Sequence, residues 1–234
     1  MRWRPAPRRH GAAAWLAGTA IPGSDVPWRE AAWCVVDLEL TGLDRSDEII
    51  AIGAVPVIGG AIQLGEAMYT LARPDRAPAH GAVLVHKLRS ADLAGAPPLS
   101  DAIEQLMGAL RGRVPVFHTA VVERTFLGRE LRRRRVRLAA EADTEALGRL
   151  WLRERGWAGA GGAGTGGAPA GLSLARLMSL LGLPGEAPHH ALGDALTTAE
   201  AFIALASHLE VLRGPQTVGS LRDAQAQLRG VRRI

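Results

Sequence analysis

Two acidic side chains stand at the end of an apolar, β-branched run near the start of the chain. The run Trp33-Cys-Val-Val-Asp-Leu-Glu-Leu40 predicts a strand, and a Thr-Gly turn follows it at once. Because side chains alternate faces along a strand, Asp37 and Glu39 would point to one side and Leu38 to the other. Two like charges side by side repel, and a hard divalent cation would neutralise them. The alternative is a solvated strand end without a metal.

Three more residues of the kinds used in hydrolysis follow later in the chain. Glu123 is predicted in the first turn of a helix, Asp194 in the last long helix, and His189 five residues before Asp194. An acidic residue in a first helical turn commonly serves only to match the helix dipole. The pair His189-His190 could equally be a surface feature of a loop. Each residue is weak evidence alone, and their order along the chain strengthens the case for a site.

Taken in that order, these residues form three motifs. They are Asp37-Leu-Glu-Leu-Thr-Gly-Leu43 with Asp47-Glu-Ile-Ile-Ala-Ile-Gly-Ala-Val55, then His118-Thr-Ala-Val-Val-Glu-Arg-Thr-Phe-Leu127, then His189-His-Ala-Leu-Gly-Asp-Ala195 with Thr198-Ala-Glu-Ala-Phe202. With them, over about residues 30–210, the chain resembles the DEDD superfamily of 3′–5′ exonucleases. The resemblance is to the branch with a histidine in the third motif, which includes the proofreading epsilon subunit of bacterial DNA polymerase III. It implies an α/β, RNase H-like fold, a mixed β-sheet flanked by helices.

The resemblance also implies a two-metal hydrolysis of phosphodiester bonds at 3′ ends. Asp37, Glu39 and Asp194 would hold one Mg²⁺ or Mn²⁺ ion, and Asp37 and Glu123 would help to place a second. His189 would be the general base, since a near-neutral pKa suits removal of a proton from water. His190 is the competing assignment, but the family's spacing to Asp194 selects His189.

The expected substrate is the 3′ end of single-stranded DNA, and the expected products are nucleoside 5′-monophosphates. Backbone N–H groups of the Thr41-Gly42 turn would face the terminal nucleotide and Leu43 would pack against its base, with Leu38 and His118 as further substrate-binding residues. Short RNA is the nearest alternative substrate, and contacts to the 2′-OH would discriminate the two. A proofreading role would add a polymerase partner, whereas a non-catalytic nucleic-acid-binding module is the alternative of a different class.

The second motif departs from the family pattern His-Asn-x-x-Phe-Asp. Thr119 replaces the Asn, Val122 the Phe and Glu123 the Asp. Glu keeps the charge but adds one methylene, roughly 1.5 Å of reach. Either the backbone or the rotamer adjusts, or the site is weakened. Leu40 also replaces the usual Thr of the first motif, a change expected to be harmless.

The rest of the chain predicts alternating strands and helices around these motifs. Further strands are expected at 48–57, at 61–72 after a Gly59-Gly60 turn, at 114–118 and within 136–142. A long Pro-containing connection is expected over 73–98. Helices are expected at 11–18, at 99–111 with Ser100 as N-cap, and at 120–135, 144–154, 172–182, 190–209 and 218–228. The Gly/Ala-rich stretch 156–171 predicts a flexible loop that would let the His189 segment close over substrate.

Composition bounds the organisation and the surroundings. The expected division is a basic arm over 1–27, an exonuclease domain over 28–212 and a basic tail over 213–234. The net charge of +5 comes almost wholly from arginine, which suits phosphate contacts. One cysteine, Cys34, excludes an intramolecular disulfide and favours a reducing compartment. The apolar stretch 12–20 is short for a signal peptide and no run is expected to span a membrane, so a cytoplasmic location is expected. Nothing in the sequence fixes the oligomeric state.

Overall fold

The fold is built on one mixed sheet, whose strand order is β3-β2-β1-β5-β6, with β4 also paired to β2. The computed structural model describes residues 20–138, 141–157, 171–185 and 189–230. β1 is antiparallel to β2 and parallel to β5, and β5 is parallel to β6. The strands are β1 Ala32–Leu40, β2 Ile49–Ile58, β3 Ala61–Ile62, β4 Met68–Leu71, β5 Val114–Phe117 and β6 Ala142–Asp143.

β1 and β2 lie centrally because their side chains are apolar on both faces. Trp33 and Val35 join one hydrophobic core, whereas Cys34 and Val36 join another on the opposite face. The alternation that separates these cores also places Asp37 and Glu39 together, on the face of Trp33 and Val35. The predicted mixed sheet flanked by helices is therefore confirmed.

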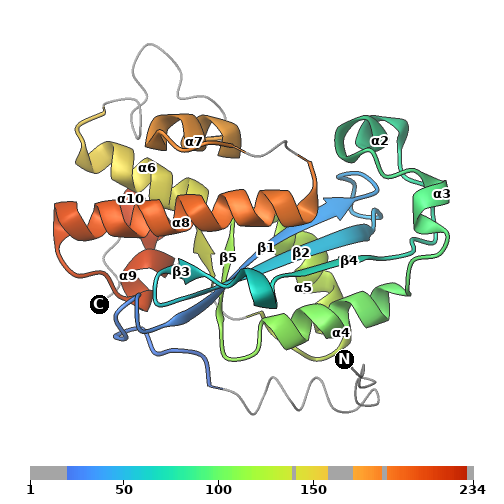
Figure 1. The fold of residues 1–234 in the computed structure, drawn as a ribbon, viewed down its shortest axis with the longest axis horizontal. Coiled ribbons are helices and arrows are strands. Elements are labelled where there is room, and N and C mark those ends of the chain that lie inside the picture. The colour runs from blue at the N-terminus through green and yellow to red at the C-terminus, as the bar shows by residue number, and fades with distance from the viewer. Residues whose placement is uncertain (1–19, 139–140, 158–170, 186–188, 231–234) are drawn as a thin grey trace.

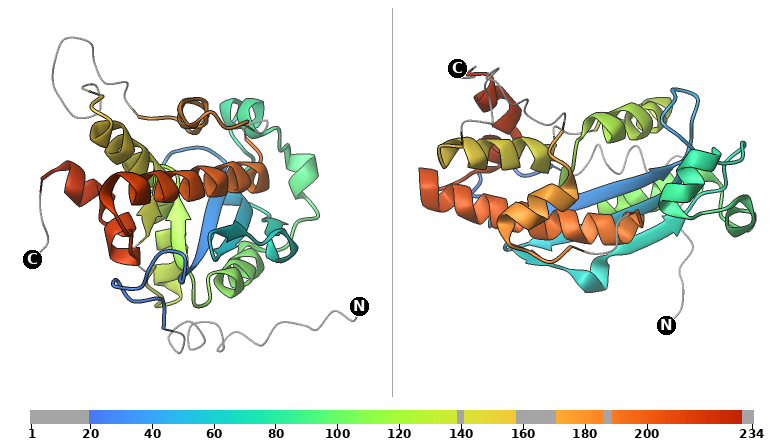
Figure 2. Two further views of the ribbon diagram at one scale, coloured as in Figure 1. Left: turned by 60° about the vertical axis from the view of Figure 1, so that its left-hand side comes forward. Right: turned by 90° about the horizontal axis from the view of Figure 1, so that it is seen from above.

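Helices cover both faces of the sheet (Figures 1 and 2). The long helix α8 crosses one face, with α6 and α7 beside it, while α4 and α5 cover the other. The helices are α2 His80–His86, α3 Ser90–Leu93, α4 Leu99–Ala109, α5 Val121–Arg133, α6 Thr144–Glu154, α7 Leu174–Leu181, α8 Ala191–Arg213, α9 Val218–Arg222 and α10 Ala224–Leu228, with a short 3₁₀ helix, η1, over Leu64–Glu66.

The structure corrects the predicted elements in several places. The helix predicted over 218–228 is two helices, α9 and α10, which meet at Asp223. The strand expected over 61–72 is interrupted by η1, and the connection expected over 73–98 contains α2 and α3. Pro98, not Ser100, is the N-cap of α4, because the helix begins at Leu99 and Ser100 is already its second residue; the Ser100 hydroxyl donates to the Asp101 carboxylate. α8 runs to Arg213, four residues beyond its predicted end. The helix predicted over 11–18 and most of the predicted 156–171 loop lie outside the described residues.

The segments that flank the predicted domain pack against it. The backbone of Val26 accepts from Val218, and Pro27 bridges to Thr217. Val218 and Leu221 are buried in the core that α8 shares with the sheet. The division into arm, domain and tail stays a prediction, but residues 20–27 and 214–230 are part of the packed structure.

The sequence predicted that no run is long enough to span a membrane. By length and apolar composition this prediction is wrong. Among the described residues, α8 is the one helix with the length and apolar composition for a span. Half of its most apolar window is nevertheless buried inside the protein. Phe202 and Leu205 of this helix pack in the hydrophobic core against the sheet.

Candidate active site

A glycine in the sheet allows the start of α8 to approach the end of β1. Gly53 of β2 is the cross-strand partner of Asp37. A Cβ at Gly53 would lie 2.2 Å from the carbonyl oxygen of Ala191, the first residue of α8. Backbone therefore packs directly on backbone here, which only glycine permits. This close approach is what brings Asp194, in the first turn of α8, to the strand that carries Asp37 and Glu39.

Three carboxylates meet at this point. One oxygen atom from each of Asp37, Glu39 and Asp194 lies within 4.8 Å of the others. Within the described ranges, no arginine, lysine or histidine side chain forms an ion pair with any of the three. The Oε1 atom of Glu39 is buried without a hydrogen-bond partner. Uncompensated carboxylate oxygens at this spacing fit the oxygen-ligand preference of a divalent cation.

The electrostatics show the cost of holding these groups together without a cation. Burial, and then the charges of Glu123, Asp194 and Glu39, raise the pKa of Asp37 well above its usual range. Burial and the Asp194 charge raise the pKa of Glu39 to about 7. Both shifts have the sign expected for clustered, desolvated acids. A bound cation would reverse them by favouring the ionised forms.

Glu123 completes the acidic surroundings from the other side of the sheet. It lies in the first turn of α5, it is only 4 % exposed, and its Oε2 atom has no hydrogen-bond partner. Burial raises the pKa of Glu123 to about 8. Glu123 stands outside the 4.8 Å cluster, yet its charge raises the pKa of Asp37 more than Asp194 or Glu39 does. A ligand role for Glu123 stays a prediction that this proximity supports.

The two consecutive histidines have different environments. His190 is the N-cap of α8: its Nδ1 accepts from the Gly193 N–H at 3.4 Å, and its ring stacks on Tyr69 with the centroids 4.7 Å apart. His189 is exposed, has a left-handed backbone with φ of 71°, and donates its N–H to Asp194 Oδ2 at 2.8 Å. The His190 ring is thus engaged in capping and stacking, whereas His189 contacts Asp194 through its backbone N–H.

The turn after β1 is held by its own side chains. Thr41 donates its hydroxyl to Asp47 Oδ1 at 2.8 Å, and its N–H donates to the Glu48 carbonyl. The N–H of Thr41 is therefore not free for a nucleotide, contrary to the prediction from the sequence. A Cβ at Gly42 would lie 2.5 Å from Asp47 Oδ2, so glycine lets the carboxylate close the turn.

An apolar pocket of about 440 Å³ opens directly beside Glu39. Leu38 and Leu43 from the β1 end, Val85 and His86 from α2, and Val122 from α5 line it. Leu43 is 80 % exposed at its rim, in the position expected of a residue that packs against a base. A flat, apolar nucleobase suits such a pocket next to a charged centre.

His118 lies next to this centre but serves the scaffold. Its Nδ1 lies 2.9 Å from the Thr144 hydroxyl, and burial lowers the pKa of its imidazole. The Asp143 carboxylate accepts from the N–H groups of Thr119 and Ala120, which fixes the start of α5. Thr119, with φ of 60°, adopts the left-handed conformation that the family's Asn would adopt more easily. The substrate role predicted for His118 remains a prediction.

Three functional positions carried too little local signal to be assigned from sequence. The first is His86. It lies in the unpredicted helix α2, with its Nε2 buried and unpaired beside the pocket. Gly53 and Tyr69 position the start of α8 through contacts between residues more than one hundred positions apart.

The sheet order, the acidic cluster at the β1 end and the adjoining pocket define an exonuclease domain. The family model described as "Exonuclease" matches residues 34–202, so the chain belongs to that family, and the predicted membership of the DEDD exonucleases is confirmed.

The relatives agree with this class. A DNA polymerase III subunit epsilon-like protein of Rhodobacter capsulatus is 33% identical over 202 residues, 85% of this chain and 27% of that protein. The chain thus spans about a quarter of that relative's length. A solved structure of Exonuclease X in complex with 5′ overhanging duplex DNA shares 25% identity with a TM-score of 0.60, covering 82% of this chain and 98% of that one. E. coli Exonuclease I in complex with a dT13 oligonucleotide has a TM-score of 0.64 at 15% identity, covering 77% and 42%, and shows the fold alone.

Proposed function

We propose that this chain is a metal-dependent 3′–5′ exonuclease that removes nucleoside 5′-monophosphates from single-stranded DNA. The observation that carries the proposal is the cluster of Asp37, Glu39 and Asp194 within 4.8 Å, which has no ion pair among the described residues and adjoins an apolar pocket. The family uses divalent metals, and a pair of Mg²⁺ or Mn²⁺ ions would activate water and stabilise the leaving 3′ oxygen. Asp37, Glu39 and Asp194 would hold one ion, and Asp37 with Glu123 the other.

The chain's own residues would bind, orient and deprotonate. The pocket between Leu43 and α2 receives the base of the 3′-terminal nucleotide, which places its phosphate over the carboxylates. His189 removes the proton from the attacking water; the residue is exposed and its backbone N–H donates to Asp194. The His190 ring, stacked on Tyr69, holds the start of α8 in position.

Single-stranded DNA is the proposed substrate because relatives with this fold were solved with DNA that carries single-stranded segments. A polymerase is the proposed protein partner, on the strength of the epsilon-like relative. A cytoplasmic location is proposed because the chain has a lone cysteine, Cys34. Burial raises the pKa of the Cys34 thiol to about 12, so this thiol is a poor nucleophile.

Digestion of end-labelled oligonucleotides tests the proposal. A 5′-labelled single strand should shorten stepwise with Mg²⁺ or Mn²⁺, release 5′-monophosphates, and stay intact with chelator or in Asp37→Asn. Faster digestion of an RNA strand of the same sequence would replace the DNA assignment. Cutting of a circular single strand would rule out a terminal mode. Strand binding without hydrolysis under every metal condition would establish the non-catalytic alternative.

A further inference from the structure

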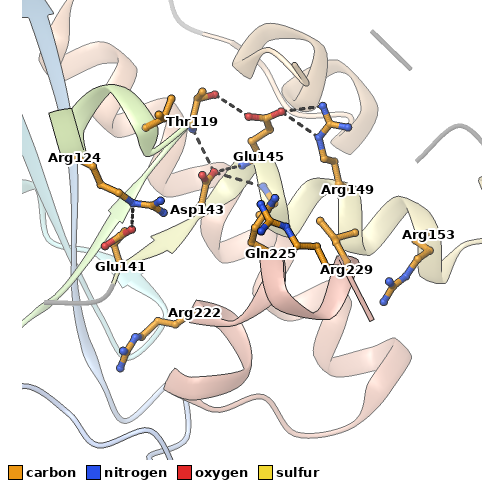
Figure 3. A pocket seen from close by; sticks show the side chains of 13 residues that line it. Thr119, Arg124, Glu141, Asp143, Glu145, Arg149, Arg153, Arg222, Gln225 and Arg229 are labelled. Carbon is orange, nitrogen blue, oxygen red and sulfur yellow. Dashed lines mark hydrogen bonds and ion pairs between the residues drawn. The ribbon is translucent and has the colours of Figure 1, made fainter. Parts of the chain in front are cut away.

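A second pocket, of about 500 Å³, lies beside the first turn of α5 (Figure 3). Val121 and Arg124 of α5 line it, while Glu123 between them belongs to the acidic surroundings. The remaining wall comes from β6, α6, α9 and the end of α10. Residues of the same helical turn therefore contribute to both sites.

Arginine dominates the lining of this pocket. Five arginines face three acids, an excess of two positive charges; they are Arg124, Arg149, Arg153, Arg222 and Arg229, against Glu141, Asp143 and Glu145. None of the described residues that line the pocket is aromatic, so these residues offer no surface on which a base could stack. The chemistry favours phosphate groups over nucleobases.

Each of the three acids is already engaged within the fold. Glu141 pairs with Arg124, and Glu145 accepts from Arg149, Thr119 and the Leu172 N–H. The Asp143 carboxylate accepts backbone N–H groups at the starts of α5 and α6, as Figure 3 shows in part. These carboxylates hold the walls together and leave the positive excess uncompensated.

The excess resides in two arginines of the C-terminal helices. Across the described part of the chain, no carboxylate forms an ion pair with Arg222 or Arg229. The Nε of Arg222 is buried without a hydrogen-bond partner, and Arg229 is exposed at the rim. A guanidinium held with an unmet donor next to a cavity is well placed to receive an oxyanion.

We propose that this arginine pocket binds backbone phosphates of the same nucleic-acid strand whose 3′ end occupies the acidic centre. The proposal rests on the proposed function. It adds a second binding site for the strand, which contacts phosphates whatever the base sequence. The strand's terminal nucleotide lies against Leu43, and phosphates farther from the 3′ end reach the pocket past the first turn of α5. Binding to longer strands should then be tighter and more sensitive to salt.

The test compares Arg229→Glu and Arg222→Gln with the control Arg176→Glu. Arg176 is exposed on α7, outside the pocket, and its third helical position accepts an acidic residue readily. Each protein is titrated, in chelator, with fluorescein-labelled dT12, with thymidine monophosphate and with inorganic phosphate. Hydrolysis of the small diester p-nitrophenyl thymidine 5′-phosphate with Mn²⁺ reports on the acidic centre alone.

Arg229→Glu should weaken dT12 binding about tenfold and lower the slope of log affinity against log salt by roughly 1. Arg222→Gln should weaken dT12 binding in the same direction, and Arg176→Glu should leave it at the wild-type value. Small-diester hydrolysis should be equal in all four proteins; its absence in all of them would instead count against the proposed function. Equal dT12 affinity in every protein would overturn the pocket's role. A loss confined to thymidine monophosphate or inorganic phosphate would replace the strand by a free anion.

Discussion

The two ends of α5 each bury a glutamate, and the structure treats them in opposite ways. Glu130, near the C-terminus of the helix, is 4 % exposed and pairs with Arg133 at 2.7 Å, Arg129 at 3.3 Å and Arg134 at 3.5 Å. Glu123, near the N-terminus, is equally buried but has no ion pair and an unpaired Oε2. The same type of side chain is neutralised where the fold supplies its counter-charge and keeps an unpaired oxygen where the fold supplies none.

The arginines near the C-terminus of α5 have different structural roles. Arg129 donates to the carbonyls of Arg45 and Asp47 at 2.7 Å each, so it ties α5 to the turn that follows β1. Arg133 and Arg134 neutralise Glu130. The arginine run that ends this helix, which by composition suits phosphate contacts, is thus partly consumed inside the fold. Among the described residues, Arg222 in α9 and Arg229 after α10 form no ion pair with a carboxylate.

The sharpest way to break the comparison is to substitute both glutamates. Glu123→Ala should lower kcat about 10³-fold, because a group that supports charge in the transition state is removed. Glu123→Asp should keep substantial activity, since it restores the family's residue. Glu130→Gln should leave kcat near the wild-type value and lower the unfolding free energy by about 1–3 kcal/mol. Steady-state kinetics and urea unfolding of the three variants measure both effects; near-wild-type turnover in Glu123→Ala would remove Glu123 from the site.

A second comparison separates the adjacent histidines. His189→Asn should lower kcat about 10²-fold or more by removing the general base, while Asn tolerates the left-handed backbone of this position. His190→Asn keeps a capping side chain and should reduce the rate far less, with a small loss of thermal stability. The pH profile of kcat is the decisive readout: its acidic limb should disappear in His189→Asn and persist in His190→Asn. The reverse pattern would make His190 the base.

The metal-free protein should lose stability as the pH rises. The folded-state pKa values of Glu39, about 7, and Glu123, about 8, lie above ordinary unfolded values near 4.3, and that of Asp37 is raised too. Protonation of these groups therefore stabilises the fold fully below about pH 4, and this contribution is lost as the pH climbs through 7 and 8.

Urea unfolding in chelator at pH 5 and pH 8.5 measures this effect. The unfolding free energy should fall by a few kcal/mol, at about 1.4 kcal/mol per pKa unit. Mn²⁺ should reverse the trend, because the ion binds the deprotonated forms. Glu123→Gln should flatten the pH slope and Glu130→Gln should not. An unchanged slope in Glu123→Gln would show that its burial does not control the titration.

The smallest effect concerns the packing that brings Asp194 into place. Gly53→Ala would force a Cβ against the Ala191 carbonyl and displace the start of α8. We expect a loss of about 1–3 kcal/mol in unfolding free energy and weaker Mn²⁺ binding. Gly108→Ala in α4, where a Cβ meets nothing within 4 Å, should stabilise by about 0.5–1 kcal/mol and leave Mn²⁺ binding unchanged. Calorimetric Mn²⁺ titration of both variants tests this; equal affinity would mean that α8 does not need the close approach.

The sequence by itself determined the extents of β1 and β2 to within one residue and singled out the candidate acidic residues. Period-two alternation placed Asp37 and Glu39 on one face, and motif spacing singled out Asp194, Glu123 and His189, because these signals are local or ordered along the chain. The Gly59-Gly60 turn was likewise readable, since both glycines adopt the positive φ that the tight β2–β3 hairpin requires.

Only the tertiary structure decided which of these groups remain unneutralised and what surrounds them. The seating of α8 on Gly53, the stacking of His190 on Tyr69 and the wall that α2 gives to the apolar pocket all join residues far apart in sequence. The packing of the chain likewise decides which arginines form ion pairs within the fold and which do not. Burial and charge compensation are properties of the packed chain, and no local pattern encodes the partner that a side chain will lack.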